Sequence, residues 1–101
     1  MHIGIAIKTI RKELNIPQYK LAIKLGISSG SLSQLENRIK SPSPKTIETF
    51  CEIFDVPLSI VYILSLEEKD ISKNMRRKYR VLYPSLRSLT LRMFTSRSII
   101  K

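Results

Sequence analysis

The chain has 101 residues, of which 43% are hydrophobic, so it can bury one core and has little room for a second domain. Eighteen Lys and Arg residues against eight Asp and Glu residues give a net charge of +10. A balance this basic favours a polyanionic partner, either nucleic acid or an anionic membrane surface. The single Cys51 excludes an internal disulfide and cannot form a metal cluster with the single His2.

The positive charge is concentrated toward the C-terminus. Residues 1–66 carry eight basic and five acidic side chains, a net charge of +3, whereas residues 67–101 carry ten basic and three acidic ones, a net charge of +7. The longest apolar run, residues 56–66, is too short to cross a bilayer. Lys8 and Arg11 interrupt the N-terminal apolar residues before a signal-peptide core could form. We therefore expect a protein of the reducing cytoplasm.

Hydrophobic residues recur at helical spacing along nearly the whole chain. A first helix is predicted over residues 3–14, and it ends before Pro17 because the residue preceding a proline is pushed out of the helical region. A second helix is predicted from Pro17 or Gln18 to Leu25. It ends at Gly26, since glycine is the residue best suited to a left-handed helix exit.

Three further helices follow before the charge distribution changes. Ser28 is the predicted N-cap of the third helix, because its hydroxyl can accept a backbone N–H from the first turn. Asn37 is the predicted end of that helix. A fourth helix is predicted to begin at Pro44, and Pro57 separates it from a fifth helix over residues 58–64.

The segment after residue 66 has a different pattern. Apolar residues again recur at helical spacing, but Lys and Arg lie between them, which predicts one or two amphipathic basic helices as far as about residue 94. The apolar stripe can form a homodimer interface, fill a groove in a partner protein, or fold back on the first domain. The basic residues suit DNA or an anionic membrane surface. The stripe consists of Ile71, Met75, Tyr79, Leu82, Leu86, Leu89 and Met93.

The second and third predicted helices have the pattern of a helix-turn-helix motif, which is two short helices joined by a tight turn containing glycine. Ala22 is small where the following helix must cross over it, and Gly26 supplies the positive φ that the turn needs. Apolar residues hold the crossing angle, so that the polar side of the third helix faces outward. They are Leu21, Leu25, Ile27, Leu32 and Leu35.

A family resemblance rests on residues 17–37, which read PQYKLAIKLGISSGSLSQLEN. This run resembles the helix-turn-helix of the lambda and 434 repressor and Cro family, also called XRE-type regulators, and the likeness extends over residues 3–66. It implies an all-α fold in which a five-helix DNA-binding domain (1–66) precedes a basic helical extension (67–101). It also implies a dimer that docks its third helices in the major groove of a symmetric operator, the geometry known for these same repressors.

The resemblance assigns DNA contacts to individual residues of this sequence. Gln34 is the best candidate for reading sequence, because a glutamine amide can pair in two directions with adenine. Base contacts are also expected from Ser29, Gly30 and Ser33, and such short side chains imply that bridging water and DNA shape contribute. Phosphate contacts are expected from Gln18, Ser28, Ser31, Asn37, Arg38 and Lys40.

One pair of residues is expected to be structural. Members of this family commonly bury a salt bridge between the positions that Arg11 and Glu36 occupy here. If the pair forms, removal of either partner would leave the other charge buried without compensation.

The function predicted from the sequence is a sequence-specific double-stranded-DNA-binding transcriptional regulator of bacterial, phage or plasmid origin, with repression favoured over activation. The alternative is an antitoxin, which would bind a toxin protein and regulate its own operon. The sequence has no paired carboxylates, no Cys–His arrangement and no phosphate-binding glycine loop, so we predict neither an enzyme nor a cofactor.

Overall fold

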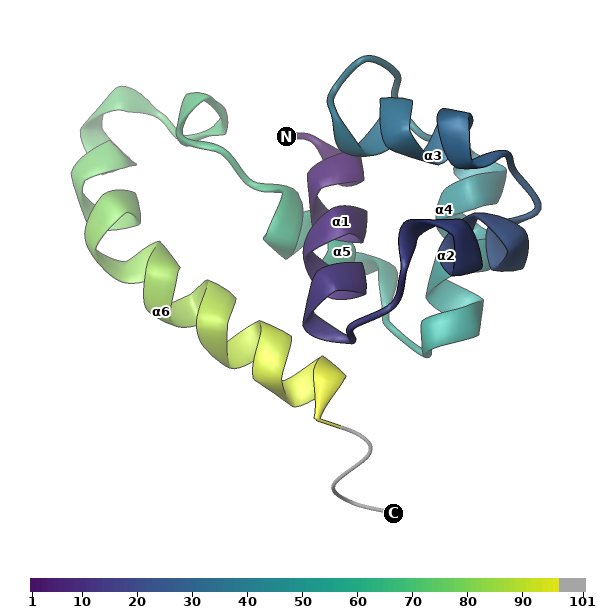
Figure 1. The fold of residues 1–101 in the computed structure, drawn as a ribbon. Helices are drawn as coiled ribbons and strands as arrows, with labels where there is room; N and C mark the ends of the chain where they lie inside the picture. The colour runs from purple at the N-terminus through teal and green to yellow at the C-terminus, as the bar shows by residue number, and fades with distance from the viewer. Residues whose placement is uncertain (97–101) are drawn as a thin grey trace.

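The computed structural model describes residues 1–96, so the last five residues of the predicted extension lie outside the described part. Six α-helices and two short 3₁₀ turns follow one another along the chain (Figure 1). No strand occurs within residues 1–96, and the predicted all-α fold is confirmed. The elements are α1 (Ile3–Glu13), α2 (Gln18–Leu25), α3 (Ser29–Glu36), α4 (Pro44–Phe54), α5 (Leu58–Ser65), η1 (Glu68–Asp70), η2 (Lys73–Met75) and α6 (Arg76–Thr95).

Local sequence signals set the ends of the first five helices. Ser28 caps α3 and Ser43 caps α4, because each hydroxyl oxygen accepts the backbone N–H three residues further on, at 3.0 and 3.1 Å. Gly26 ends α2 in the left-handed conformation, with a φ of 71°. The predicted limits of α1, α2, α3 and α5 and the predicted start of α4 agree with the observed ones to within one residue.

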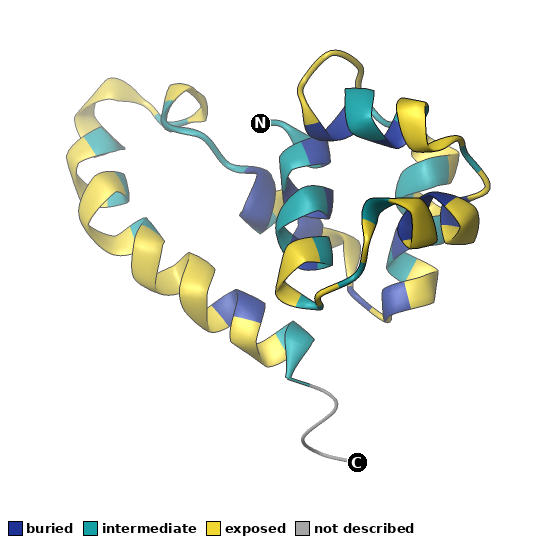
Figure 2. Ribbon diagram, in the orientation of Figure 1, coloured by how far each residue is buried: buried dark blue, intermediate teal, exposed yellow. Residues whose placement is uncertain are grey.

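The core is formed mainly by aliphatic side chains from all five of these helices (Figure 2). α1 is the central element, since it packs against α3, α5 and α6, while α2 packs against α3 and α4. Cys51, on α4, is half-buried and packs against this core. The buried hydrophobic residues are Ala6, Ile7, Ile10, Leu21, Ala22, Leu25, Leu32, Leu35, Phe50, Phe54, Val56, Val61, Leu64 and Leu91.

The extension forms one long helix. α6 spans 20 residues and continues through Pro84, although proline lacks the backbone N–H that would donate to the carbonyl four residues earlier. Figure 1 shows that the first turns of α6 stand apart from α1 to α5, while its last turns return to the lower end of α1. The contact between this helix and the five-helix domain is therefore concentrated at a few points.

Two tyrosines and a leucine attach α6 to the domain. The hydroxyl of Tyr79 donates to the carbonyl oxygen of Leu66 at 3.1 Å. The hydroxyl of Tyr83 donates to the carbonyl oxygen of Ile63 at 2.6 Å. Burial raises the pKa of both tyrosines. Leu91, near the other end of the helix, joins the core at 5% exposure.

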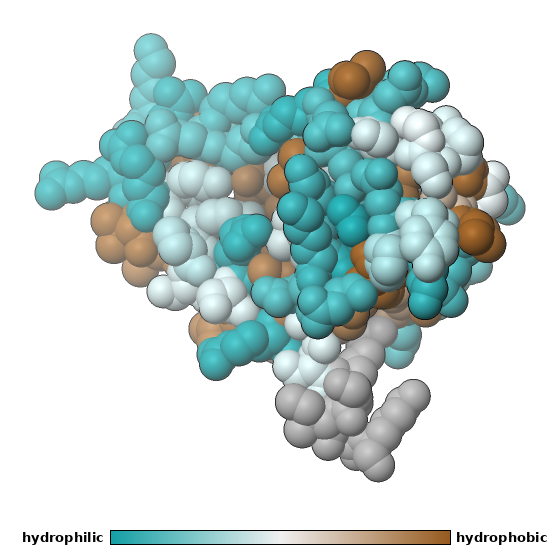
Figure 3. All heavy atoms as spheres, in the orientation of Figure 1, coloured by the Kyte–Doolittle hydropathy of each residue, from teal (hydrophilic) through white to brown (hydrophobic). Residues whose placement is uncertain are grey.

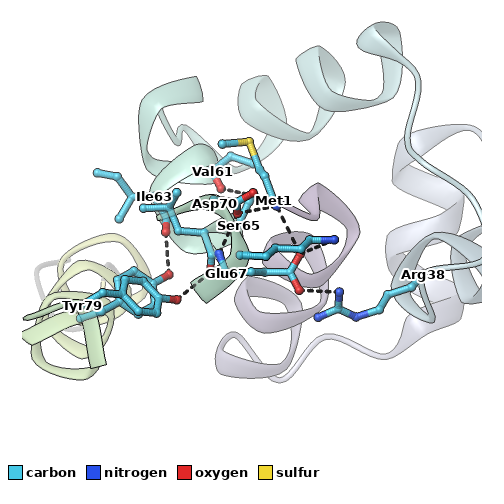
Figure 4. A network of polar contacts seen from close by, with 11 residues as sticks. Met1, Arg38, Val61, Ile63, Ser65, Glu67, Asp70 and Tyr79 are labelled. Atoms are coloured by element: carbon cyan, nitrogen blue, oxygen red, sulfur yellow. Dashed lines mark hydrogen bonds and ion pairs between the residues drawn. The ribbon is translucent and has the colours of Figure 1, made fainter. Parts of the chain in front are cut away.

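The linker between α5 and α6 is held by ion pairs around Glu67 (Figure 4). The Glu67 carboxylate lies 2.7 Å from Nη1 of Arg38 and 3.2 Å from the amino group of Met1. The same amino group contacts Asp70, whose carboxylate accepts the backbone N–H of Glu67 at 2.9 Å. The hydrogen bond from Arg38 holds the pKa of Glu67 below its ordinary value, and the bond from the Met1 amino group does so for the pKa of Asp70.

Gly4 allows α1 to approach the end of α3 very closely. A Cβ atom at this position would lie 1.9 Å from the carbonyl oxygen of Leu35 and 2.8 Å from its carbonyl carbon. Backbone atoms cannot turn aside as a flexible side chain can, so only glycine permits this distance between the two helices. The position of α3 therefore depends on a residue in the first turn of α1.

We predict that Gly4→Ala destabilises the protein by about 1–3 kcal/mol, because overpacking outweighs the better helix propensity of alanine. Chemical denaturation monitored by circular dichroism measures the change. Gly30→Ala is the matched control, since a Cβ there would meet nothing closer than Ser28 Oγ at 3.9 Å, and it should gain up to about 1 kcal/mol. Stabilisation by Gly4→Ala would contradict the close approach.

We also predict that the linker ion pairs are sensitive to acid. The pKa values of Glu67 and Asp70 are lowered by folding, so these groups stabilise the folded state above their ordinary pKa of about 4 and lose that contribution as pH falls through the lowered values. Glu67→Gln should therefore reduce the free energy of unfolding by about 1 kcal/mol or less at pH 7, and the deficit should vanish in acid. Glu48→Gln, an exposed change on α4, is the control; a deficit that persists at pH 2 would refute the prediction.

Candidate nucleic-acid interface

The turn between α2 and α3 determines how α3 is presented. The backbone N–H of Ile27 donates to the carbonyl oxygen of Ala22 at 3.0 Å, which closes the turn directly after Gly26. Ile27 is half-buried against the core, and Ala22 is 1% exposed where α2 meets α3. A small residue at the crossing and an apolar residue in the turn thus seat α3 on α2.

α3 has a buried face and a polar face. Its buried residues are Leu32, Leu35 and Glu36, which lie within two turns of one another on the side toward α1 and α2. All four residues predicted at base edges lie on the other side of the helix. Ser29 and Gly30 are exposed, and Ser33 and Gln34 are half-buried.

The side chain of Gln34 is available for a ligand. Among residues 1–96, no hydrogen bond engages its amide group. The nearby Asn37, by contrast, donates from Nδ2 to Oγ of Ser33 at 3.2 Å. Gln34 therefore has its full set of donors and acceptors to offer to a base edge.

A buried ion pair ties the end of α3 to α1. Nε and Nη2 of Arg11 donate to the two carboxylate oxygens of Glu36 at 2.8 and 2.9 Å, the two-pronged geometry that a guanidinium favours. Glu36 is 1% exposed, and Nε2 of Gln18 donates to the same carboxylate at 3.1 Å. Arg11 also donates to the carbonyl oxygen of Ile16 at 2.8 Å. This network joins α1, the start of α2 and the end of α3.

The side chains of four of the six residues predicted at phosphates already have partners within the protein: Gln18, Ser28, Asn37 and Arg38. The amide nitrogen of Gln18 is bonded to Glu36, although its second N–H can still donate. The oxygen of Ser28 caps α3, and its hydroxyl hydrogen can point elsewhere. Arg38, in a left-handed backbone conformation, is paired with Glu67 of the linker. Asn37 is exposed and is bonded to Ser33, whereas Ser31 is half-buried and Lys40 is exposed.

The structure exposes apolar side chains around the motif that the sequence pattern does not single out. Tyr19 and Ile23 lie on the outer side of α2 at 56% and 74% exposure. Ile39 is 69% exposed between Arg38 and Lys40, just beyond α3. An apolar residue between two helices is equally consistent with a core position, so only the structure reveals its exposure.

Comparison with protein families identifies the motif. A helix-turn-helix family model matches residues 7–61, which is more than half of the chain. The chain belongs to this helix-turn-helix family. Its members of the Cro and C1 type are DNA-binding transcription regulators, so the resemblance expected from residues 17–37 is confirmed.

One curated protein illustrates the relationship. The immunity repressor protein of Bacillus phage phi105 is 32% identical to the chain over 87 residues. The alignment covers 74% of this chain and 60% of the phage protein, so the chain spans about three-fifths of the length of that relative. No solved structure matches the chain with significance.

The described residues contain neither a candidate membrane span nor a candidate metal site. None of the described helices is long and apolar enough to traverse a bilayer. Within residues 1–96, no three His, Cys, Asp or Glu side chains are grouped so that they could hold a metal ion.

We predict that Arg11→Met destabilises the protein by about 3–5 kcal/mol, because it strands the buried carboxylate of Glu36. The double variant Arg11→Met with Glu36→Leu should recover most of this loss, since it removes both charges. Denaturant unfolding of the two variants and the parent protein measures the difference. A double variant as unstable as the single one would show that the ion pair is not the origin of the effect.

Proposed function

We propose that this protein is a sequence-specific repressor of transcription that binds DNA as a dimer and reads the major groove with α3. The observation that carries the proposal is the uncharged polar face of α3, which is turned outward while Leu32, Leu35 and the Glu36 ion pair hold the opposite face. Membership of the helix-turn-helix family supports DNA binding, and the phage relative is itself named a repressor.

Gln34 is the residue expected to read a specific base. Its unengaged amide can both accept from N6 and donate to N7 of adenine, which makes a two-point contact that other bases do not match. Gly30 adds no side chain to the same face, so the backbone of α3 can approach the floor of the groove closely. Ser29 and Ser33 are too short to read bases at a distance, so water and DNA shape are expected to supply the remaining selectivity.

The phosphate contacts are expected on both sides of α3. The N-terminus of α2 with Gln18, and the hydroxyl of Ser28, can donate to one stretch of backbone. Arg38 and Lys40 follow α3 and can contact the phosphates of a second stretch of DNA backbone. For Arg38 this requires that its guanidinium leaves Glu67 and bonds to a phosphate oxygen. Binding to DNA would then compete with the ion pair that holds the linker.

The experiment that tests the proposal begins with selection of bound duplexes from a random DNA pool. An operator with two half-sites about one helical turn apart is expected, because a two-fold dimer presents two copies of α3. Gln34→Ala should then lose about 1–3 kcal/mol of binding on the selected operator and far less on random DNA, measured by fluorescence anisotropy at fixed salt.

Lys45→Ala is the matched control, because Lys45 is exposed on α4 and is not among the residues expected at base edges or phosphates. It should leave the discrimination between operator and random DNA unchanged. Equal losses on both DNAs in Gln34→Ala would remove Gln34 from the reading role, and failure to select any sequence would refute the proposal as a whole. The antitoxin alternative stays a prediction that depends on a toxin partner.

A further inference from the structure

One flank of α6, next to the face that packs on the domain, carries an exposed apolar stripe. Five of its side chains, all Leu or Met, are between 45% and 70% exposed, and Tyr79 lies in line with them. Figure 2 shows α6 exposed over most of its length, and Figure 3 shows brown apolar atoms at the edge of the molecule where α6 runs. Contiguous apolar surface of more than a few hundred Å² usually marks an interaction site. We call this surface the α6 seam: Met75, Tyr79, Leu82, Leu86, Leu89 and Met93.

The spacing of the α6 seam is that of a coiled coil. The successive residues of the seam are four, three, four, three and four positions apart, which is the spacing of a heptad repeat. The d positions are Met75, Leu82 and Leu89, and the a positions are Tyr79, Leu86 and Met93. A stripe restricted to a and d positions is narrower than the face that a helix buries in a globular core. The seam is therefore shaped to receive one other helix along the 20-residue length of α6, which is about 30 Å.

A groove beside the seam adds to this surface. It has a volume of about 330 Å³ and is closed on one side by Leu66 and Ile71 of the linker. Its other side is formed by members of the seam, including Met75, Leu82 and Leu86. A helix lying along the seam would place its own apolar side chains in this groove, in the manner of knobs in holes.

The charges around the seam decide which helix can occupy it. In a parallel pair of identical helices, a g position faces the e position of the next heptad. Lys78 would then face the half-buried Tyr83 of the second copy, so no like charges meet there. The next e position, Thr90, is buried within its own protomer and brings no charge to the pair. An antiparallel pair in the matching register would instead set Lys78 beside Arg92 of the second copy, where the two cations repel.

We propose that the α6 seam binds the same seam of a second copy of this chain, as a parallel two-stranded coiled coil. This inference rests on the proposed function, because it supplies the contact that holds the DNA-binding dimer together. The opposite side of α6, which carries Val81 and Ser88, stays in solvent.

The attachment of α6 to the domain helps such a pair to form. A short isolated helix is only marginally stable in water, so two free peptides would first have to become ordered. Here the hydroxyl bonds of Tyr79 and Tyr83 and the burial of Leu91 hold α6 in place within each copy. The two seams are thus presented as rigid surfaces, which reduces the entropy lost on association.

Sedimentation equilibrium of the full chain provides the first test. The parent protein should be a dimer, and Leu82→Gln with Leu89→Gln should weaken dimerisation on the order of a hundredfold or more, because four buried leucines are lost per dimer. Val81→Gln with Ser88→Gln is the matched control, since it places the same side chains seven residues apart on the opposite side of α6. Circular dichroism and thermal unfolding establish that both variants remain folded.

Disulfide cross-linking provides the second test, in a Cys51→Ser background. Leu89→Cys should form a covalent dimer under mild oxidation, because equivalent d positions face each other in a parallel pair, whereas Ser88→Cys should not. An antiparallel pair would set Leu89 opposite Tyr79 of the second copy, so absence of the Leu89→Cys cross-link would overturn the parallel arrangement.

Three other results would overturn the proposal. The first is a parent protein that is monomeric. The second is a dimer that stays intact in the Leu82→Gln, Leu89→Gln variant. That result would point instead to an interface at the groove formed by Ile47, Leu58 and Tyr62 on α4 and α5. The third is a monomer whose binding to vesicles of anionic phospholipid depends on these two leucines. None of these results bears on α3, because the preference of Gln34 for the selected operator is measured separately.

Discussion

The buried carboxylate of Glu36 is the interaction on which the arrangement of the DNA-binding domain depends. An ion at 1% exposure is tolerated only if its oxygens are fully paired, and here Arg11 and Gln18 provide the pairing from two other helices. The pair therefore acts over 25 residues of sequence and fixes the end of α3 relative to α1. Gly4 complements it, because the same end of α3 could not come so close to α1 if that residue had a Cβ.

The rigidity of this attachment has a functional meaning if α3 reads DNA. A helix that offers Ser29, Gly30 and Ser33 has little reach, so its backbone must be placed close to the base edges with small error. The ion pair and the tight contact at Gly4 supply that accuracy from the interior of the protein. The longer side chain of Gln34 can then make a selective contact without having to correct for a mobile helix.

The extension is connected to the reading domain by both charge and packing. Arg38 lies directly after α3 yet bonds to Glu67 of the linker, so one cation is shared between the proposed phosphate site and the start of the extension. α6 is attached by the hydroxyls of Tyr79 and Tyr83 and by Leu91, and it leaves the Leu and Met side chains of the α6 seam exposed. The same segment can thus support the domain and join two copies of it.

The sequence by itself determined the five-helix domain, because the signals that end its helices are local: proline at 17 and 57, glycine at 26, and the capping Ser28 act within a turn of their own position. The family likeness likewise lies in one continuous run. The tertiary structure alone decided three matters: that Gly4 lies directly against the backbone of Leu35, that Arg38 bonds to Glu67, and that α6 is one helix with its seam exposed. Each depends on which residues distant in sequence meet in space, and periodicity shows that a side chain lies on an apolar stripe without showing what covers that stripe.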